Sequence, residues 1–590
     1  MIKAGNSLDL LHNEDYGAAF DPRNFGHAGM VFMGGRARQS LNGRWTFTLD
    51  RFDTGLRQHW YRDCHLPIEG RHVPWDYDVH NGETIDVPSC WNLARPDYWH
   101  YEGSAWYGRR FAFEPDADAE RVVLRIGAAH YDTKVFLNGR FLGNHLGGST
   151  PFFVEIGDRL EADNWLLLCV NNERTLDRVP MRHCDWFNYG GVFREVDLIR
   201  LPRTFIKDLF IYLVPDGAGR HVAVKLALSD PVDGDAVVAI PSLGIETRLL
   251  IRAGRSEVVL SASPELWSPE TPILHRVEAR FGDDRVADRI GFREIRTEGR
   301  TILLNGQPIK LRGVCVHEDD RDRGRLTDDV DIRRRFAHAK ELEANFVRLA
   351  HYPHHERAAE IADQMGLLLW EEIPVYWGIA FNDPLTLADA DNQLRELIIR
   401  DRNRASVIAW GVGNENADTD ARLDFMRRLT ATARQLDPSR LVAAACLVNR
   451  DAKTIDDRLA AHLDLVGINE YYGWYEPDLA DLVEIGKRYH LDKPLIVTET
   501  GADAPAGRRS DRNELFSEDH MAACYRAQFE AIAGIDAIKG FCPWILYDFR
   551  SERRKNSFQQ GFNRKGLIDA DKATRKLAFH ALKRFYTEVW

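Results

Sequence analysis

Two glutamates end apolar runs in the C-terminal half of the chain, where paired carboxyl groups could do acid–base and nucleophilic chemistry. Glu415 closes the run VIAWGVGNE and Glu499 closes PLIVTE. Burying a carboxylate is costly unless it has a partner or a function. In glycoside hydrolysis, one carboxyl group protonates the leaving oxygen and another attacks the anomeric carbon. The spacing alone leaves a second interpretation open, in which one or both glutamates form salt bridges with arginines.

The elements that must position these side chains alternate between strands and helices. After about residue 298, eight apolar runs are interspersed with amphipathic helical stretches such as DIRRRFAHAKELEAN. Alternation of this kind predicts parallel β/α units, and eight units predict a closed TIM barrel with its active site at the carboxyl ends of the strands. The other chemically capable residues at predicted strand ends are His317, Glu318, Asp319, Arg348, His351, Asn469, Tyr471, Tyr472 and Trp544.

The first half of the chain is predicted to be β-structure. Short alternating runs such as RVVLRIG and TKVFLNG, punctuated by Gly, Asn, Asp and Pro, predict an all-β domain from about residue 38 to residue 201. A second series of such runs follows Pro202 and suits an immunoglobulin-like sandwich. We therefore expect three domains, at residues 1–202, 203–297 and 298–590.

Composition excludes several classes of function. The chain has 590 residues and a formal net charge of -12, so it is a poor candidate for binding nucleic acid or an anionic membrane. No apolar run approaches the ~20 residues that span a bilayer. The eight cysteines are scattered without a C-x-x-C pair, which favours free thiols in a reducing compartment. Since the N-terminus also lacks the apolar core of a signal peptide, we expect a cytoplasmic protein.

Several motifs in a fixed order resemble one family over essentially the full length of the chain. YEGSAWYGR and DWFNYGGVFREV lie in the first domain, and LRGVCVHEDD, NFVRLAHYPH, AWGVGNEN, NEYYGWY, VTETG and PWILYDF follow in the predicted barrel. In this order they resemble glycoside hydrolase family 2, which includes β-glucuronidases, β-galactosidases and β-mannosidases. The resemblance implies a jelly-roll sandwich, an immunoglobulin-like sandwich and a catalytic barrel. It also implies a retaining exo-β-glycosidase that needs no cofactor and no metal.

The same resemblance assigns roles to residues at the predicted strand ends. It places the acid/base at Glu415 and the nucleophile at Glu499. Asn414 resembles the asparagine that binds the 2-hydroxyl of the sugar, and Tyr471 resembles the tyrosine that contacts the nucleophile. His351 and Trp544 resemble walls of the sugar subsite, where Trp544 would offer an apolar face to the ring.

The stretch QQGFNRKGLID predicts which sugar is bound. Asn563 and Lys565 match the N-x-K motif of the family's β-glucuronidases, in which an amide and an ammonium bind the C6 carboxylate. A uronic acid requires such donors in a partly dry pocket, whereas a neutral hexose does not. Bacterial glucuronidases often carry an arginine four residues before the asparagine, but this chain has Gln559, and Arg554 is a nearby basic residue that could substitute. Asp185 matches a first-domain residue near the barrel mouth and is expected to bind a sugar hydroxyl. From composition alone, NRKG would be interpreted as a solvated basic turn.

These observations predict an enzyme that hydrolyses terminal β-D-glucuronides on a small-molecule glycoside or an oligosaccharide end. The alternatives are a β-galactosidase, β-galacturonidase or arabinosidase of the same family, or a carbohydrate-binding protein with an inactive barrel. A metal site at His351, His354 and His355 is disfavoured because Pro353 interrupts their spacing. The family resemblance also leads us to expect a homo-oligomer.

Overall fold

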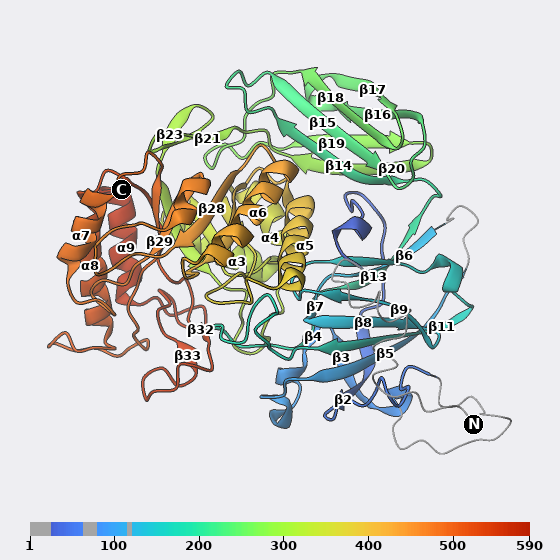
Figure 1. Cartoon of the computed structure of the whole chain (residues 1–590), viewed down its shortest axis with the longest axis horizontal. Coiled ribbons are helices and arrows are strands. Elements are labelled where there is room, and N and C mark those ends of the chain that lie inside the picture. The colour runs from blue at the N-terminus through green and yellow to red at the C-terminus, as the bar shows by residue number, and fades with distance from the viewer. Residues whose placement is uncertain (1–24, 63–78, 115–120) are drawn as a thin grey trace.

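The computed structural model describes residues 25–62, 79–114 and 121–590. Two β-sandwich domains and one barrel follow each other along the chain (Figure 1). This architecture confirms the fold class predicted from the sequence. Cys64 and the start of the chain lie outside the described residues. None of the helices within the described ranges combines the length and apolar character needed to cross a bilayer.

The first domain is a sandwich of antiparallel sheets. One sheet has the order β3-β2-β5-β11-β8-β9, a second has the order β1-β13-β6-β10, and a small third has the order β4-β12-β7. Alternating side chains from the two larger sheets, such as Leu124 and Leu168, form a buried core between them. The strands are β1 (Gln39–Ser40), β2 (Gly43–Asp50), β3 (Glu83–Val87), β4 (Ser89–Cys90), β5 (Ser104–Ala112), β6 (Arg121–Ile126), β7 (Ala129–His130), β8 (Asp132–Leu137), β9 (Arg140–Leu146), β10 (Phe152–Glu155), β11 (Asp163–Asn171), β12 (Gly191–Val192) and β13 (Val196–Leu201).

The second domain is a smaller sandwich with its own core. Sheet β14-β15-β18 packs against sheet β17-β16-β19-β20, and the regular in–out burial along β19 shows why these runs form strands. Its strands are β14 (Ile206–Leu213), β15 (His221–Leu228), β16 (Gly234–Ile240), β17 (Ile245–Ile251), β18 (Arg255–Ser261), β19 (His275–Phe281) and β20 (Asp284–Ile290). A three-stranded sheet, β21 (Ile295–Glu298), β22 (Thr301–Leu304) and β23 (Gln307–Ile309), leads into the barrel.

The third domain is a closed barrel of eight parallel strands. The strands are almost entirely buried, which explains their continuous apolar runs. They are β24 (Leu311–Val316), β25 (Phe346–Leu349), β26 (Leu368–Glu372), β27 (Val407–Asn414), β28 (Leu441–Cys446), β29 (Leu465–Asn469), β30 (Leu495–Glu499) and β31 (Ile538–Phe541). A two-stranded sheet, β32 (Phe549–Arg550) and β33 (Phe562–Asn563), follows the last barrel strand.

Helices surround the barrel, and most of them begin at a capping side chain. Asp328, Asp383, Thr419, Asp478 and Ser517 each accept a hydrogen bond from a backbone N–H of the first turn that follows. The helices are α3 (Asp329–Glu341), α4 (Glu356–Met365), α5 (Pro384–Asp401), α6 (Asp420–Leu436), α7 (Leu479–Arg488), α8 (Glu518–Ala533) and α9 (Leu577–Glu588). After β28 the connection is a short 3-10 helix, η8 (Arg458–His462), instead of an α-helix. This regular frame directs the strand ends toward one mouth.

Candidate active site

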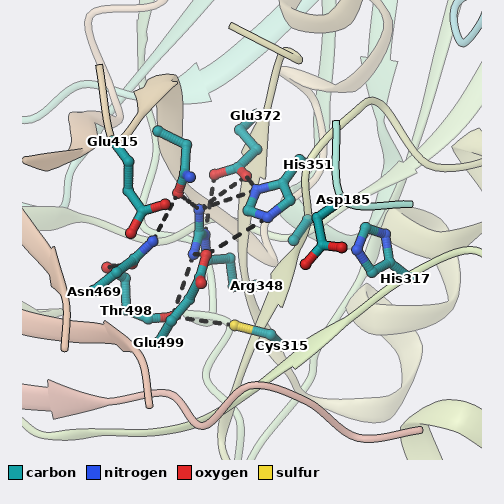
Figure 2. A network of polar contacts seen from close by, with 12 residues as sticks. Asp185, Cys315, His317, Arg348, His351, Glu372, Glu415, Asn469, Thr498 and Glu499 are labelled. Carbon is teal, nitrogen blue, oxygen red and sulfur yellow. Dashed lines mark hydrogen bonds and ion pairs between the residues drawn. The ribbon is translucent and has the colours of Figure 1, made fainter. Parts of the chain in front are cut away.

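Arg348 is the centre of a hydrogen-bonded network at the barrel mouth (Figure 2). It is fully buried at the end of β25. Its guanidinium donates to both oxygens of Glu372 at 3.0 and 3.1 Å, and to Glu499 Oε1 at 2.8 Å. Burial alone would lower the pKa of Arg348, but these carboxylates raise it well above its usual value. The cation therefore holds the ends of β25, β26 and β30 in one arrangement.

Glu499 ends β30 and is almost completely buried. Besides Arg348, the Tyr471 hydroxyl donates to its Oε2 at 2.8 Å, and His351 Nε2 lies 3.5 Å from its Oε1. Burial raises the pKa of Glu499 to about 8, and the charge of Glu415 acts in the same direction, whereas Arg348 and Tyr471 oppose the shift. Figure 2 shows the Glu415 and Glu499 side chains beside the same network around Arg348. The alternative interpretation of the sequence, a salt bridge to an arginine, therefore also applies to Glu499, because Glu499 pairs with Arg348.

Glu415 follows the last residue of β27 and has a strained backbone. Its φ of 51° lies in the left-handed region that non-glycine residues rarely adopt, and Trp377 has a φ of 53°. The Trp377 indole N–H donates to Glu415 Oε2 at 2.8 Å. Figure 2 shows the Glu415 side chain directed toward Asn469 and the network around Arg348. Backbone strain at two residues in contact is typical of a functional site, where a side chain is held in a defined position.

Asn414 brings an unused hydrogen-bond donor to the site. Its Oδ1 accepts from Arg348 at 2.8 Å and from Asn469 Nδ2 at 3.1 Å, while Thr498 in turn donates to Asn469 at 2.8 Å. The Asn414 Nδ2 atom is buried without a hydrogen-bond partner among the described residues. Because such a group is costly, a ligand oxygen at this point would be favourable.

His351 and Trp544 form one side of the site. Their rings stack at 4.8 Å between centroids with an interplanar angle of 23°, and both residues are buried. His351 Nδ1 lies 2.7 Å from Glu372 Oε1, but burial dominates and lowers the pKa of His351 to about 4. His354 and His355 diverge from it, because His354 bonds to the backbone of Ala350 and His355 caps α4.

The predicted uronate residues lie in a second cluster beside the network. Lys565 is almost fully buried, and its ammonium donates to Asp503 Oδ2 at 2.6 Å and to the Tyr475 hydroxyl at 2.8 Å. The same ammonium lies 5.6 Å from the centre of the Tyr471 ring, and Asn563 Oδ1 accepts from the backbone of Lys565. NRKG is therefore not a solvated turn at Lys565. Burial would raise the pKa of Asp503, but Lys565 outweighs it and the pKa is lowered.

Asp185 reaches the mouth from the first domain. Figure 2 places its side chain between His351 and His317. Its carboxylate accepts from the Ser551 hydroxyl at 2.6 Å and forms a two-point ion pair with Arg554. Asp185 therefore joins the first domain to the segment after β32, in addition to any sugar it contacts.

Sequence reasoning missed several residues that contribute to these clusters, among them three that bind the predicted side chains directly. Glu372 neutralises Arg348, Trp377 binds Glu415, and Asp503 pairs with Lys565. Glu372 and Asp503 follow apolar strands in LLLWEE and VTETGAD, so the strand-end argument that found Glu499 could also have found them. Nothing in the sequence marks Trp377 except its place in the loop after β26.

Open space flanks Glu415. A cavity of ≈1000 Å³ between the first domain and the barrel includes Trp186, Trp377 and Arg553 in its lining, and a second of ≈330 Å³ includes Glu415, Asn469 and Arg450. Trp377 therefore separates the larger cavity from a carboxyl group of the network. A substituent that leaves the site past Glu415 has room on this side.

A closed β/α barrel with paired glutamates at strand ends four and seven is an arrangement suited to glycoside hydrolysis. The model of the family "Glycosyl hydrolases family 2, TIM barrel domain" matches residues 295–590, and that of "Glycosyl hydrolases family 2, sugar binding domain" matches residues 38–202. The chain belongs to glycoside hydrolase family 2 and is a glycoside hydrolase.

Individual relatives cover nearly the whole chain. A "Beta-glucuronidase" of Paenibacillus borealis is 28% identical over an alignment of 568 residues, and the match covers 88% of this chain and 92% of that protein. Among solved structures, an uncultured Clostridium sp. "Beta-glucuronidase" is 26% identical with a TM-score of 0.82, covering 94% of this chain and 98% of its own. A "GH2 beta-galacturonidase" from Eisenbergiella tayi is 25% identical with a TM-score of 0.81, covering 95% and 98%.

Proposed function

We propose that this enzyme hydrolyses terminal β-D-glucuronides by double displacement, with Glu499 as nucleophile and Glu415 as acid/base. The observation that carries the proposal is the different setting of the two glutamates. Arg348 and Tyr471 bind Glu499 and favour its ionised form, whereas among the described residues only the neutral Trp377 indole donates a hydrogen bond to the Glu415 side chain. A nucleophile must be ionised, and an acid must hold a proton.

The two chemical steps follow from these positions. A Glu499 oxygen attacks the anomeric carbon and forms a glycosyl ester, while Glu415 gives its proton to the departing glycosidic oxygen. Glu415 then takes a proton from water, and the resulting hydroxide attacks the same carbon and releases Glu499 as a carboxylate. Both attacks invert the carbon, so the product retains its β-configuration. Proton NMR of the first-formed sugar tests this, and an initial α-anomer would refute retention.

Asn414, His351 and Trp544 are proposed to hold the sugar during these steps. The unpartnered Nδ2 of Asn414 would donate to the 2-hydroxyl, a contact that strengthens in the transition state of glycosidases. The Trp544 ring, stacked on His351, would offer an apolar wall to the sugar. Tyr471 would keep the nucleophile oriented through its hydrogen bond.

The choice of a glucuronide rests on Lys565 and Asn563 together with the relatives named β-glucuronidase. A panel of matched 4-nitrophenyl β-glycosides provides the test: glucuronide, galacturonide, galactoside, glucoside and α-L-arabinoside. The proposal predicts the highest kcat/KM for the glucuronide. Equal or faster hydrolysis of the galactoside would refute it.

A β-galacturonidase is the second candidate, because one similar solved structure carries that name. Glucuronic and galacturonic acids share the C6 carboxylate and differ only at C4, so cations that bind the carboxylate do not distinguish them. The ratio of kcat/KM for the two aryl uronides decides between these candidates.

We also propose a cytoplasmic location and a homo-oligomeric state. The seven cysteines within the described ranges are free and buried, which suits a reducing compartment. Fractionation of the native host and light scattering of the purified protein test these two proposals. A monomer at micromolar concentration would refute the second.

A further inference from the structure

Two cations in this structure converge on a single hydroxyl oxygen. Lys565 Nζ lies 2.8 Å and Arg554 Nη1 lies 3.0 Å from the oxygen of Tyr475. A phenol has two acceptor lone pairs and one O–H donor. Because the two cations occupy the lone pairs, the O–H points elsewhere as a donor, and Tyr475 is 49% exposed. An ammonium, a guanidinium and a hydroxyl thus form a group of three donors at the mouth of the barrel.

Gln559 cannot supply the positive charge that an arginine gives at this position in many bacterial glucuronidases. Its amide nitrogen donates to Asp503 Oδ1 at 2.9 Å, and its oxygen accepts from Asn556 at 2.8 Å. The side chain is buried and already bonded at both ends. It supports the carboxylate that pairs with Lys565 and does not face a ligand.

Asp185 of the first domain fixes the orientation of the Arg554 guanidinium. Its Nε and Nη2 atoms donate to the two oxygens of Asp185, and the Ser551 hydroxyl fixes that carboxylate at 2.6 Å. The two-point ion pair leaves Nη1 directed at Tyr475. Asp185 lies beside His351 in Figure 2. Arg554 therefore links a carboxylate next to His351 to the Tyr475 hydroxyl, which Lys565 also contacts.

We propose that Arg554 is the second cation of a uronate-binding subsite, where it binds the C6 carboxylate of the substrate together with Lys565 and the Tyr475 O–H. Asp185 is the positioning residue for this arginine. The proposal rests on the proposed function, because a neutral sugar would present no carboxylate to these donors. In this chain an arginine five residues earlier in the same β32–β33 connection replaces the one that Gln559 does not provide.

The test compares 4-nitrophenyl β-D-glucuronide with the matched glucoside, which differs only at C6. Arg554→Gln should lower kcat/KM for the glucuronide roughly 10- to 100-fold, as expected for loss of a charge-assisted hydrogen bond, and leave the glucoside within about threefold. Lys555→Gln removes a charge from the exposed neighbouring side chain and should change neither rate. An equal loss on both substrates, or no loss on the glucuronide, would overturn the proposal.

Two further measurements separate this proposal from the proposed function. If the wild-type enzyme shows no preference for the glucuronide over the glucoside, the proposed function itself fails. A wild-type preference that survives Arg554→Gln overturns only the role of Arg554. Arg554→Lys keeps the positive charge but loses the two-point binding of the guanidinium. It should therefore retain more of the preference for the glucuronide over the glucoside than Arg554→Gln, and the reverse order would contradict the proposal.

Discussion

At the residue scale, the pH dependence of activity should follow the ionisation of Glu499. Burial and the charge of Glu415 raise the pKa of Glu499 to about 8. A nucleophile must be ionised, so the active fraction of the enzyme should grow as the pH rises toward this value. We expect kcat/KM for an aryl glucuronide to rise with pH up to about pH 8. A profile that is flat between pH 5 and pH 8 would contradict this assignment.

Glu415→Gln isolates the ionisation of Glu499. With a 2,4-dinitrophenyl glucuronide, whose leaving group needs little protonation, kcat/KM of the variant should rise with pH to a plateau as Glu499 ionises. The midpoint should lie below 8, because the charge of Glu415 is gone, and above the ordinary value of 4.5, because burial remains. Measurement of kcat/KM from pH 4 to pH 10 checks both limits. A midpoint at or above pH 8 would contradict the contribution of the Glu415 charge.

Trp377 is expected to position the acid/base. Trp377→Phe removes the N–H that lies 2.8 Å from Glu415 Oε2 but keeps an aromatic ring. We predict a loss in kcat/KM of roughly 10-fold for a phenyl glucuronide, which needs a placed proton donor, and a smaller loss for the 2,4-dinitrophenyl substrate. Equal losses would indicate a general disturbance of the site. Phe381→Leu, on the same loop but outside the network, is the control for local packing.

At the element scale, Arg348 links the ends of four barrel strands. It bonds to Glu372 on β26, Asn414 on β27 and Glu499 on β30 from its own position on β25. Arg348→Met should abolish activity and lower the free energy of unfolding by about 3–5 kcal/mol, because it leaves buried carboxylates without a cation. Urea unfolding measures the loss. Adding Glu372→Gln to this variant should recover part of the stability but none of the activity. If the losses in the free energy of unfolding of the two single variants were strictly additive, the two residues would not be coupled in one network.

The strand order could be predicted from the sequence, but the contacts between strand ends could not. Continuous apolar runs identified the eight barrel strands, and the strand-end rule found Glu415 and Glu499 without any coordinates. The bond from Arg348 to Glu499 joins residues 151 positions apart, and no local pattern encodes which strand-end cation meets which carboxylate. The same holds for Asp503, whose pairing with Lys565 depends on how the segment after β33 folds back. Family motifs indicated Asn563 and Lys565 as the proposed uronate residues. The orientation of Arg554 depends on its ion pair with Asp185, which no motif indicates.

At the scale of the whole molecule, buried ion pairs join the first domain to the barrel. Glu318 follows β24 and accepts from Arg194 of the first domain at 3.0 Å and from Arg325 at 3.3 Å. Both side chains of the Arg194 pair are 2% exposed. Burial would raise the pKa of Glu318, but Arg194 and other nearby cationic groups outweigh it and hold the pKa well below 4.5. Burial lowers the pKa of Arg194, yet an arginine remains protonated at neutral pH.

Glu318→Gln should therefore destabilise the protein in a pH-dependent way. A carboxyl group whose pKa is depressed on folding contributes stability above its unfolded pKa, and that contribution is lost as the pH falls. At pH 7 we expect a loss of about 3–5 kcal/mol, because two buried arginines lose their counter-ion. The difference from wild type should shrink below about pH 4.5, the ordinary value for a glutamate.

Glu552→Gln is the control, because it breaks a partly exposed pair with Arg174 between the same two domains. It should cost less than about 1 kcal/mol at any pH. Thermal and urea unfolding at pH 7 and pH 4 measure both variants, and a Glu318→Gln loss that grows toward acid pH would contradict the sign of this prediction.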